Sequence, residues 1–263
     1  FALFPVIWIV SAAFNPSGSL YSGSLVPPNA DWSNFANLGD AGDGLFFRWT
    51  LNSLIVSTTT AALAVLLTAL SAYAFSRFRF RLRRQLLMTI LLVQVFPPML
   101  TMVALFLLLQ ILGGYIPVLG LNTYGGLILV YLGGQMGINI WFMKGFFDSI
   151  PMEIDESAQV EGASHLQAFW YLVLPIARPV LAVIGLLVFI GTFGEFILAS
   201  IFMRSNENYT LMVGLYLYIS DPVAQRWGIF AAGSIIASIP IVALYLALQD
   251  NIVSGLTRGA TKG

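Results

Sequence analysis

The sequence predicts an all-α, polytopic membrane protein, and two features of the chain carry that prediction. Of its 263 residues, 58% are hydrophobic and only 9% are charged, whereas an average soluble domain has about 25% charged residues. Such a chain lacks the charge to cover a surface that faces water. Its apolar residues also gather in runs comparable to the roughly 20 residues that cross the hydrocarbon core of a bilayer.

Six such runs are the expected transmembrane helices. They cover residues 1–14, 50–75, 86–110, 124–144, 180–203 and 229–249. The first run is short, and neither a Met nor a basic region precedes its sequence FALFPVIWIVSAAF. We therefore interpret it as the remainder of a truncated first helix and not as a cleaved signal peptide, which would show a charged start and a small-residue cleavage site.

Basic residues between the runs predict the orientation of the chain. Nine of the twelve Lys and Arg residues lie on one side, in the loop SRFRFRLRR, the 144–178 connection and the C-terminal tail. The opposite side has three, Arg48, Arg204 and Arg226. Because cytoplasmic loops are enriched in Lys and Arg, we expect the first side, which includes the C-terminus, to face the cytoplasm.

The connections on the outer side differ in character. Residues 15–48 are rich in Gly, Pro, Ser and Asn and predict an ordered but irregular loop. Residues 204–227 are mixed, and their stretch LMVGLYLYI fits either a short interfacial helix or a re-entrant segment. The expected organisation is a first helix at 1–14, an extracytoplasmic loop at 15–48, a transmembrane domain at 49–249 with a polar loop at 150–175, and a C-terminal tail at 250–263.

The polar loop between the fourth and fifth expected spans predicts two short helices. Pro151 suits the first turn of the first helix, and the helix dipole favours the acids that follow, Glu153, Asp155 and Glu156. Gly162 interrupts, and Ser164 with Gln167 has the capping-box spacing that starts a second helix. Periodicity alone is equally compatible with a surface amphipathic helix that merely links two spans.

Composition excludes several kinds of site. The chain has no Cys, which removes disulfides, thiolate nucleophiles and Cys-based metal sites, and His165 is its one histidine. We therefore expect no metal site and no catalytic residue. The chain also lacks a G-x-x-x-x-G-K-[ST] phosphate loop, so it is not expected to hydrolyse ATP by that route. Its net charge of zero gives no indication of a nucleic-acid partner.

The order of residues in the polar loop resembles a known family motif. Glu156-Ser157-Ala158 is followed after three residues by Gly162, and after nine more by Leu172-x-Leu174-Pro175. This is similar to the cytoplasmic EAA loop of ABC importer permeases, in which EAA, three residues, Gly and nine residues precede Ile, any residue, Leu and Pro. Three positions depart mildly from the pattern, because Ala, Asp and Ile are replaced by Ser157, Glu161 and Leu172.

The resemblance implies a type I ABC importer permease fold, in which the loop forms coupling helices that fit a cleft on a separate ATP-binding subunit. In that family, closure of two ATP-binding subunits swings these helices and switches the membrane halves between inward-facing and outward-facing states. ATP and Mg would be bound by the partner, with no cofactor in this chain. The residues expected at the ATPase contact are Glu156, Ser157, Ala158, Glu161, Gly162, Ala163, Leu174 and Pro175.

Nearly the whole chain resembles the smaller permease subunit of maltose/maltodextrin importers, including FNPSGSLYSGSLVPPNADWSNF, WGIFAAGSIIASIPIVALYLALQ and the tail NIVSGLTRGATKG. That resemblance implies a sugar permease of the bacterial inner membrane. It would work with a larger permease subunit, a homodimeric ATP-binding subunit, an extracytoplasmic sugar-binding protein and membrane lipid.

Two further sites follow from this resemblance. The tail is expected to act in coupling between the ATP-binding subunits through Gly255, Leu256, Thr257, Gly259 and Lys262, and a disordered terminus is the alternative. The outer connection is expected to contact the binding protein through Asn206, Glu207, Asn208, Tyr209 and Thr210, and a turn that only joins two spans is the alternative.

Glu195 falls inside the fifth expected span, where a carboxylate costs about 3 kcal/mol on insertion scales and should face the protein interior or a cavity. It is either a lining or gate residue against the partner subunit, or a group that hydrogen-bonds Thr192 or backbone and fixes helix packing. The other polar residues in the spans are Gln94, Gln135 and Asn139. No sugar ligand is assigned to this chain.

Other classes of function stay open. A secondary transporter or channel would not need the EAA-spaced loop and would more often carry several intramembrane charges. A polytopic membrane enzyme would need a catalytic constellation, and the sequence shows no paired His, Cys or interfacial acid cluster. The sugar could be maltose, a longer maltodextrin, a cyclodextrin or another oligosaccharide.

Overall fold

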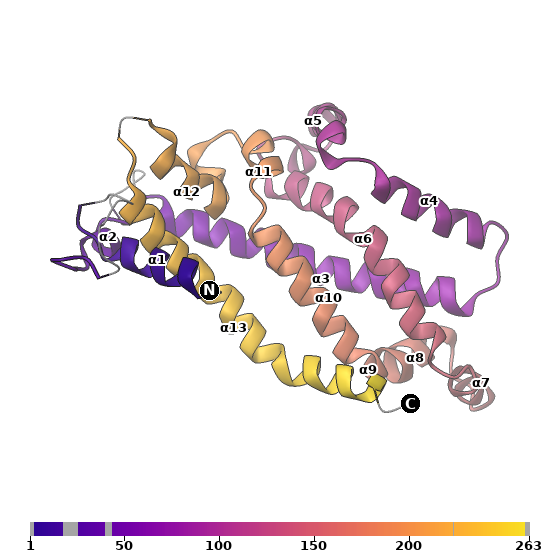
Figure 1. The fold of residues 1–263 in the computed structure, drawn as a ribbon. Coiled ribbons are helices and arrows are strands. Elements are labelled where there is room, and N and C mark those ends of the chain that lie inside the picture. The colour runs from indigo at the N-terminus through magenta and orange to yellow at the C-terminus, as the bar shows by residue number, and fades with distance from the viewer. Residues whose placement is uncertain (1–2, 18–25, 40–43, 223, 261–263) are drawn as a thin grey trace. The chain divides into compact units, whose positions relative to one another are not determined.

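The computed structural model describes residues 3–17, 26–39, 44–222 and 224–260, with the backbone alone described at 98–99 and 251–260. All regular structure in these ranges is helical, which confirms the all-α fold class (Figure 1). The α-helices are α1 (Phe4–Ala13), α2 (Ser33–Ala36), α3 (Phe46–Arg77), α4 (Arg83–Val95), α5 (Pro98–Tyr115), α6 (Tyr124–Asp148), α7 (Glu153–Val160), α8 (His165–Ala168), α9 (Leu174–Ile176), α10 (Arg178–Phe193), α11 (Ile197–Phe202), α12 (Leu211–Ser220) and α13 (Trp227–Ala260).

Three single helices in the described ranges are long and apolar enough to cross a membrane, and the number rises to five if each of two bent helix pairs is one span. The single helices are α3, α6 and α13, which contain the expected spans at 50–75, 124–144 and 229–249. The short apolar helix α1 has 10 residues. These elements confirm the membrane class of the chain.

Two expected spans are interrupted rather than continuous. The run at 86–110 is split between α4 and α5, which meet at a bend of 107°. Pro97 and Pro98 lie at that break. They explain it, because a proline lacks the backbone N–H that a helix needs and disfavours the helical conformation of the residue before it. The run at 180–203 ends as α10 at Phe193, and α11 begins only at Ile197.

The chain forms two compact units, and long helices contribute residues to both. The first unit comprises residues up to Val56, Leu109–Leu127 and Phe193–Ala243. Its centre holds large side chains with less than 2% exposure, Leu38, Phe46, Trp49, Leu127, Phe193 and Phe202. The buried amide of Asn34 donates to the carbonyls of Ala13 and Asn15 at 3.0 and 2.9 Å, so it satisfies backbone groups at the end of α1 that have no helical partner.

The second unit comprises Ser57–Leu108, Ile128–Thr192 and the residues from Leu244 on. Its fully buried side chains include Met143, Phe147, Phe169 and Ile184. The indole Nε1 of Trp141 on α6 donates to the carbonyl of Leu87 on α4 at 2.9 Å. The C-terminal half of α3, the end of α6 and the helices α7 to α9 all belong to this unit, so the polar loop and its supports can be described together.

Candidate functional site

The polar loop folds as two short helices, as its sequence predicts. The first, α7, begins at Glu153 with Met152 as its N-cap, and no side chain caps it. Pro151 therefore precedes the helix and is not in its first turn, which corrects the expected start by two residues. The three acids of the first turn supply the negative charge that a helix N-terminus favours. Glu153 and Glu156 are exposed, whereas Asp155 is buried.

Gly162 ends α7 in a Schellman motif. Its φ of +91° lies in the left-handed region that glycine adopts without penalty. The N–H of Gly162 donates to the carbonyl of Gln159 at 3.0 Å, and the N–H of Ala163 donates to that of Ala158 at 2.9 Å. These two bonds are the pair that defines the motif, so Gly162 has a structural role in this chain before any partner is considered.

The second helix starts at the predicted capping box. Ser164 Oγ accepts from the N–H of Gln167 at 3.3 Å, and Gln167 Oε1 accepts from the N–H of Ser164 at 2.8 Å. After α8 the chain passes through a π-helical segment, Phe169–Val173, and the short α9 before α10 begins. The segment from His165 to Ile176 makes an angle of 79° with α10.

A surface depression of about 380 Å³ lies between the two short helices. Four of the residues expected at the ATPase contact line it, Ala158, Glu161, Gly162 and Ala163, together with Gln167, Ala168, Tyr171 and Leu172. We call these eight residues the docking surface. Glu156 and Ser157 are exposed on α7 outside its lining, and Leu174 and Pro175 are half-buried in α9. The structure thus brings half of the expected residues onto one recessed surface.

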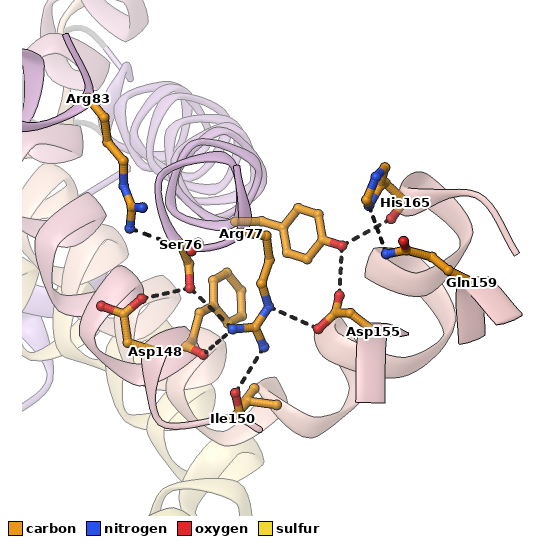
Figure 2. A network of polar contacts seen from close by, with 10 residues as sticks. Ser76, Arg77, Arg83, Asp148, Ile150, Asp155, Gln159 and His165 are labelled. Carbon is orange, nitrogen blue, oxygen red and sulfur yellow. Dashed lines mark hydrogen bonds and ion pairs between the residues drawn. The ribbon is translucent and has the colours of Figure 1, made fainter. Parts of the chain in front are cut away.

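A buried polar network fastens α7 from the inner side (Figure 2). Arg77, the last residue of α3, forms an ion pair with Asp155, with 2.9 Å between Nε and Oδ2 and side chains only 5% and 6% exposed. Asp155 Oδ1 also accepts from the hydroxyl of Tyr73 at 2.8 Å. Both carboxylate oxygens therefore have a donor, which a buried charge requires.

The same arginine holds the end of α6. Arg77 Nη1 donates to the carbonyl of Phe147 and Nη2 to that of Ile150, both at 3.1 Å. Phe147 lies in the last turn of α6 and Ile150 just beyond it, where backbone carbonyls lack the regular helical partner; the carbonyl of Phe147 also accepts from the N–H of Ile150 at 3.1 Å. Ser76 adds a bond from its Oγ to Asp148 Oδ1 at 2.7 Å. Figure 2 shows these groups converging on the guanidinium from α3, α6 and α7.

Sequence reasoning did not single out Tyr73, Arg77 or Asp155 as a network. In the sequence, Arg77 is one member of a basic run, and Asp155 is one of three acids at a predicted helix start. A signal exists, because Asp155 is three residues from the small apolar Ala158, so the two lie on one side of α7, where both are buried. An acid on the buried face of a short helix needs a cation, and Arg77 stands at the end of a span nearby in the expected topology.

Glu195 caps α11. Its Oε1 accepts from the N–H of Leu198 at 2.8 Å and its Oε2 from that of Ala199 at 3.0 Å. Thr192, the other expected partner, instead donates to the carbonyls of Val188 and Phe189. These bonds support the interpretation in which Glu195 fixes helix packing. Its partners are backbone N–H groups, and Thr192 is not one of them. The break after α10 gives this carboxylate free N–H groups to bind.

In the outer connection, the segment 206–209 is hydrogen-bonded to side chains of α3. The indole Nε1 of Trp49 donates to the carbonyl of Asn206 at 2.6 Å, and the amide of Asn52 donates to those of Glu207 and Tyr209, each at 2.9 Å. Asn206 and Glu207 remain exposed, whereas Thr210 is buried. The stretch LMVGLYLYI forms α12, with several residues buried in the first unit.

Four of the five expected tail residues belong to α13. The backbone of α13 continues through Gly255, Leu256, Thr257 and Gly259 to Ala260, and Lys262 lies outside the described residues.

In the part of the chain that the structure describes, no group of three or more His, Asp or Glu residues could hold a metal ion.

A protein-family model described as "Binding-protein-dependent transport system inner membrane component" matches residues 64–258, which is more than half of the chain and includes the whole polar loop. The chain belongs to this family. The inner membrane component is 40% identical over 262 residues to the galactooligosaccharides transport system permease protein GanQ of Bacillus subtilis, covering 99% of this chain and 90% of the relative.

Other relatives are similar along the whole of the inner membrane component. It is 38% identical over 268 residues to the maltodextrin transport system permease protein MdxG of Bacillus subtilis. It is 39% identical over 272 residues to the maltose/maltodextrin transport system permease protein MalG of Photorhabdus laumondii. Each alignment covers 99% of this chain and 91% of the relative.

Solved structures share the fold of the inner membrane component. A bacterial ABC transporter involved in the import of the acidic polysaccharide alginate contains a chain that matches with a TM-score of 0.80 and 26% identity, over 95% of this chain and 90% of that one. A bacterial alginate ABC transporter, in complex with an alginate pentasaccharide-bound periplasmic protein, matches with a TM-score of 0.68 and 19% identity. The second likeness shows the fold alone.

Proposed function

We propose that this chain is a permease subunit of an ABC importer that moves maltose- or maltodextrin-type oligosaccharides into the cytoplasm. The observation that carries the proposal is the recessed docking surface. It gathers Ala158, Glu161, Gly162 and Ala163 of the EAA-like loop on one face, within a chain of the binding-protein-dependent transport family.

The docking surface suits a separate ATP-binding subunit. Among the residues that the structure describes, no atom lies within 4 Å of a Cβ added at Gly162, so the space beside it is open for a partner. The rim carries the exposed acid Glu161, which is the C-cap of α7, and Glu156 is exposed on α7 itself. ATP and Mg would be bound by two copies of the partner, and this chain would contribute motion and no catalysis.

The other partners follow from the same assignment. A larger permease subunit would complete the pathway, and an extracytoplasmic sugar-binding protein would contact the outer segment at 206–210. The carbonyls of that segment are tied to Trp49 and Asn52 of α3, so its exposed side chains are presented from a fixed backbone. We place the chain in the inner membrane, with loop 150–175 and the C-terminus in the cytoplasm.

A second oligosaccharide class is supported by one comparison. The 40% identity to a permease named for galactooligosaccharides makes galactooligosaccharides an alternative to maltodextrins. A panel assay separates the two. The complex of both permease subunits, ATPase and binding protein is reconstituted in vesicles, and ATPase stimulation is measured with binding protein loaded with maltose, maltotriose, a cyclodextrin or a galactooligosaccharide.

Cross-linking tests the ATPase contact itself. The chain has no Cys, so a single Glu161→Cys on the rim of the docking surface can carry a specific cross-linker. We expect it to capture the ATP-binding subunit, whereas Val118→Cys, which is 68% exposed in the first unit, should not. Transport by the chain in vesicles that contain no ATPase would overturn the assignment.

A further inference from the structure

We propose that Arg77 and Asp155 are positioning residues that fasten α7 to the end of α3, so that the two helices move as one body when the docking surface is displaced. The inference rests on the proposed function, because the fastening matters for transport only if a separate ATPase moves the loop. It assigns the transmitted motion to named side chains of the second unit.

The ion pair joins segments that are 78 residues apart in the chain. Its exposure of 5% and 6% excludes solvent from both charges. A charge-assisted bond in such a place is shorter and stronger than a neutral one, and separating the partners would leave two unpaired charges without water. The pair therefore resists sliding of α7 along α3 more than an apolar contact of the same size would.

Arg77 is fixed on both sides. Its Nε donates to Asp155. Its Nη1 donates to the carbonyl of Phe147, near the end of α6, and its Nη2 to that of Ile150, just beyond that end. Because the guanidinium is planar and its donors have a rigid fork geometry, binding all three acceptors fixes the orientation of the group. The end of α6 is thus included in the same body as α3 and α7.

Tyr73 adds a second attachment one turn earlier on α3. Its hydroxyl donates to Asp155 Oδ1 at 2.8 Å and lies 3.3 Å from the carbonyl oxygen of His165, the first residue of α8. Its ring packs against Phe169 with 5.0 Å between centroids. Both short helices of the loop are therefore held by the same turn of α3, and α8 cannot shift without disturbing Tyr73.

The docking surface lies less than one helical turn away from these attachments. Asp155 and Ala158 are three residues apart on α7, and Ala158 belongs to the docking surface while Asp155 belongs to the network. A push applied at the docking surface therefore passes through less than one turn of helix before it reaches Arg77. This route ends on α3, which is one of the helices long enough to cross the membrane.

A distance measurement tests the proposal directly on the reconstituted complex. Spin labels are placed at Met152→Cys, at the start of α7, and at Leu67→Cys on the exposed side of α3, since the chain has no native Cys. In the otherwise unchanged chain we expect the interlabel distance to stay the same with and without bound ATP. A distance that changes with ATP would overturn the proposal, and this result needs no folding of any network variant.

Variants of the pair test the link to transport. With Asp155→Asn or Arg77→Gln, we expect the complex still to assemble but the distribution of interlabel distances to become broader. The number of ATP molecules hydrolysed per sugar imported should rise severalfold. Arg77→Lys, which keeps the charge but offers a single point of attachment, should give an intermediate ratio. The double variant Arg77→Leu with Asp155→Leu removes both buried charges, so it should regain thermal stability but not the normal ratio.

Lys144→Gln is the matched control, because Lys144 pairs with Asp148 Oδ2 within α6, whereas Ser76 of α3 bonds the other carboxylate oxygen, Oδ1. It should leave both the label distance and the ratio unchanged. If the Asp155→Asn and double variants hydrolyse the normal number of ATP molecules per sugar imported, this inference is contradicted, while the proposed function is unaffected. Loss of ATPase co-purification by the unaltered chain would instead contradict the proposed function.

Discussion

Gly214 of α12 lies so close to the indole ring of Trp49 on α3 that any side chain there would overlap the ring. Trp49 is 1% exposed, and its Nε1 donates to the carbonyl of Asn206. The ring therefore has little freedom to move aside. This one contact sets how near α12 approaches α3 in the first unit.

Gly214→Ala should destabilise the protein by about 1–3 kcal/mol, because overpacking in a filled core forces shifts of side chains or backbone. Thermal unfolding in detergent measures the change. Gly133→Ala in α6 is the control, since a Cβ there meets no atom of the described residues within 4 Å, and it should be neutral or stabilising by up to ~1 kcal/mol. Equal melting temperatures for the two variants would contradict the packing argument.

Gly162→Asp should leave the protein folded and inserted but reduce binding-protein-stimulated ATPase activity and transport together. The conformational cost in this chain is about 1 kcal/mol, because only the positive φ opposes a side chain. The larger effect would come from a collision with the docked partner. Gly162→Asn tolerates the left-handed conformation but is also bulky, so it should fold better and couple equally badly. Normal transport by Gly162→Asp would show that nothing docks there.

Glu195→Ala should lower stability by about 0.5–2 kcal/mol, since the variant removes the acceptor for two N–H groups at the start of α11. Glu195→Gln keeps one amide oxygen and should lose less. The measurements are unfolding temperature and transport rate in parallel. If transport falls sharply while the unfolding temperature does not change, the lining or gate interpretation is favoured over the packing one.

Asn122→Ala should weaken binding-protein-dependent stimulation. The side-chain Oδ1 of Asn122 accepts from the N–H groups of Arg204 and Ser205 at 2.9 and 3.1 Å, and its φ is 60°. Asn122→Gly keeps the backbone conformation but loses these bonds, so it separates the two contributions. Both variants should raise the concentration of binding protein needed for half-maximal ATPase activity. Unchanged stimulation in both would indicate that the 204–209 segment needs no such support.

Deleting residues 255–263 should lower sugar-stimulated ATPase activity without preventing assembly of the complex. The backbone of α13 continues as helix as far as Ala260, so the deletion shortens one end and leaves the helix core in place. Co-purification measures assembly, and ATPase assays with loaded binding protein measure the coupling. Loss of co-purification would assign the tail to assembly instead.

Local patterns predicted much of the polar loop. The Ser164–Gln167 capping box and the interruption at Gly162 depend only on residues a few positions apart, and both are present as expected. The placement of α7 was less well predicted, because Pro151 is compatible with several positions around a helix start. Its real start depends on Met152 and the turn before it.

Long-range contacts could not be read from one sequence. The pairing of Arg77 with Asp155 depends on which face of α7 turns inward, and the Glu195 cap depends on a break in an otherwise uniformly apolar run. Hydropathy averages over such breaks, so it joined α10 and α11 into a single span. The prolines at 97 and 98 were visible in the sequence but did not by themselves separate a kinked helix from two helices.

The burial of Arg77 has a consequence for biosynthesis. Asp155 follows it by 78 residues, so the arginine leaves the ribosome long before its acidic partner exists. In the proposed topology, its positive charge at the end of a hydrophobic segment would help during that interval to keep the arginine-rich loop in the cytoplasm. In that topology the same side chain would act first as a topological signal for the nascent chain, and it would be buried only when the later helices pack against it.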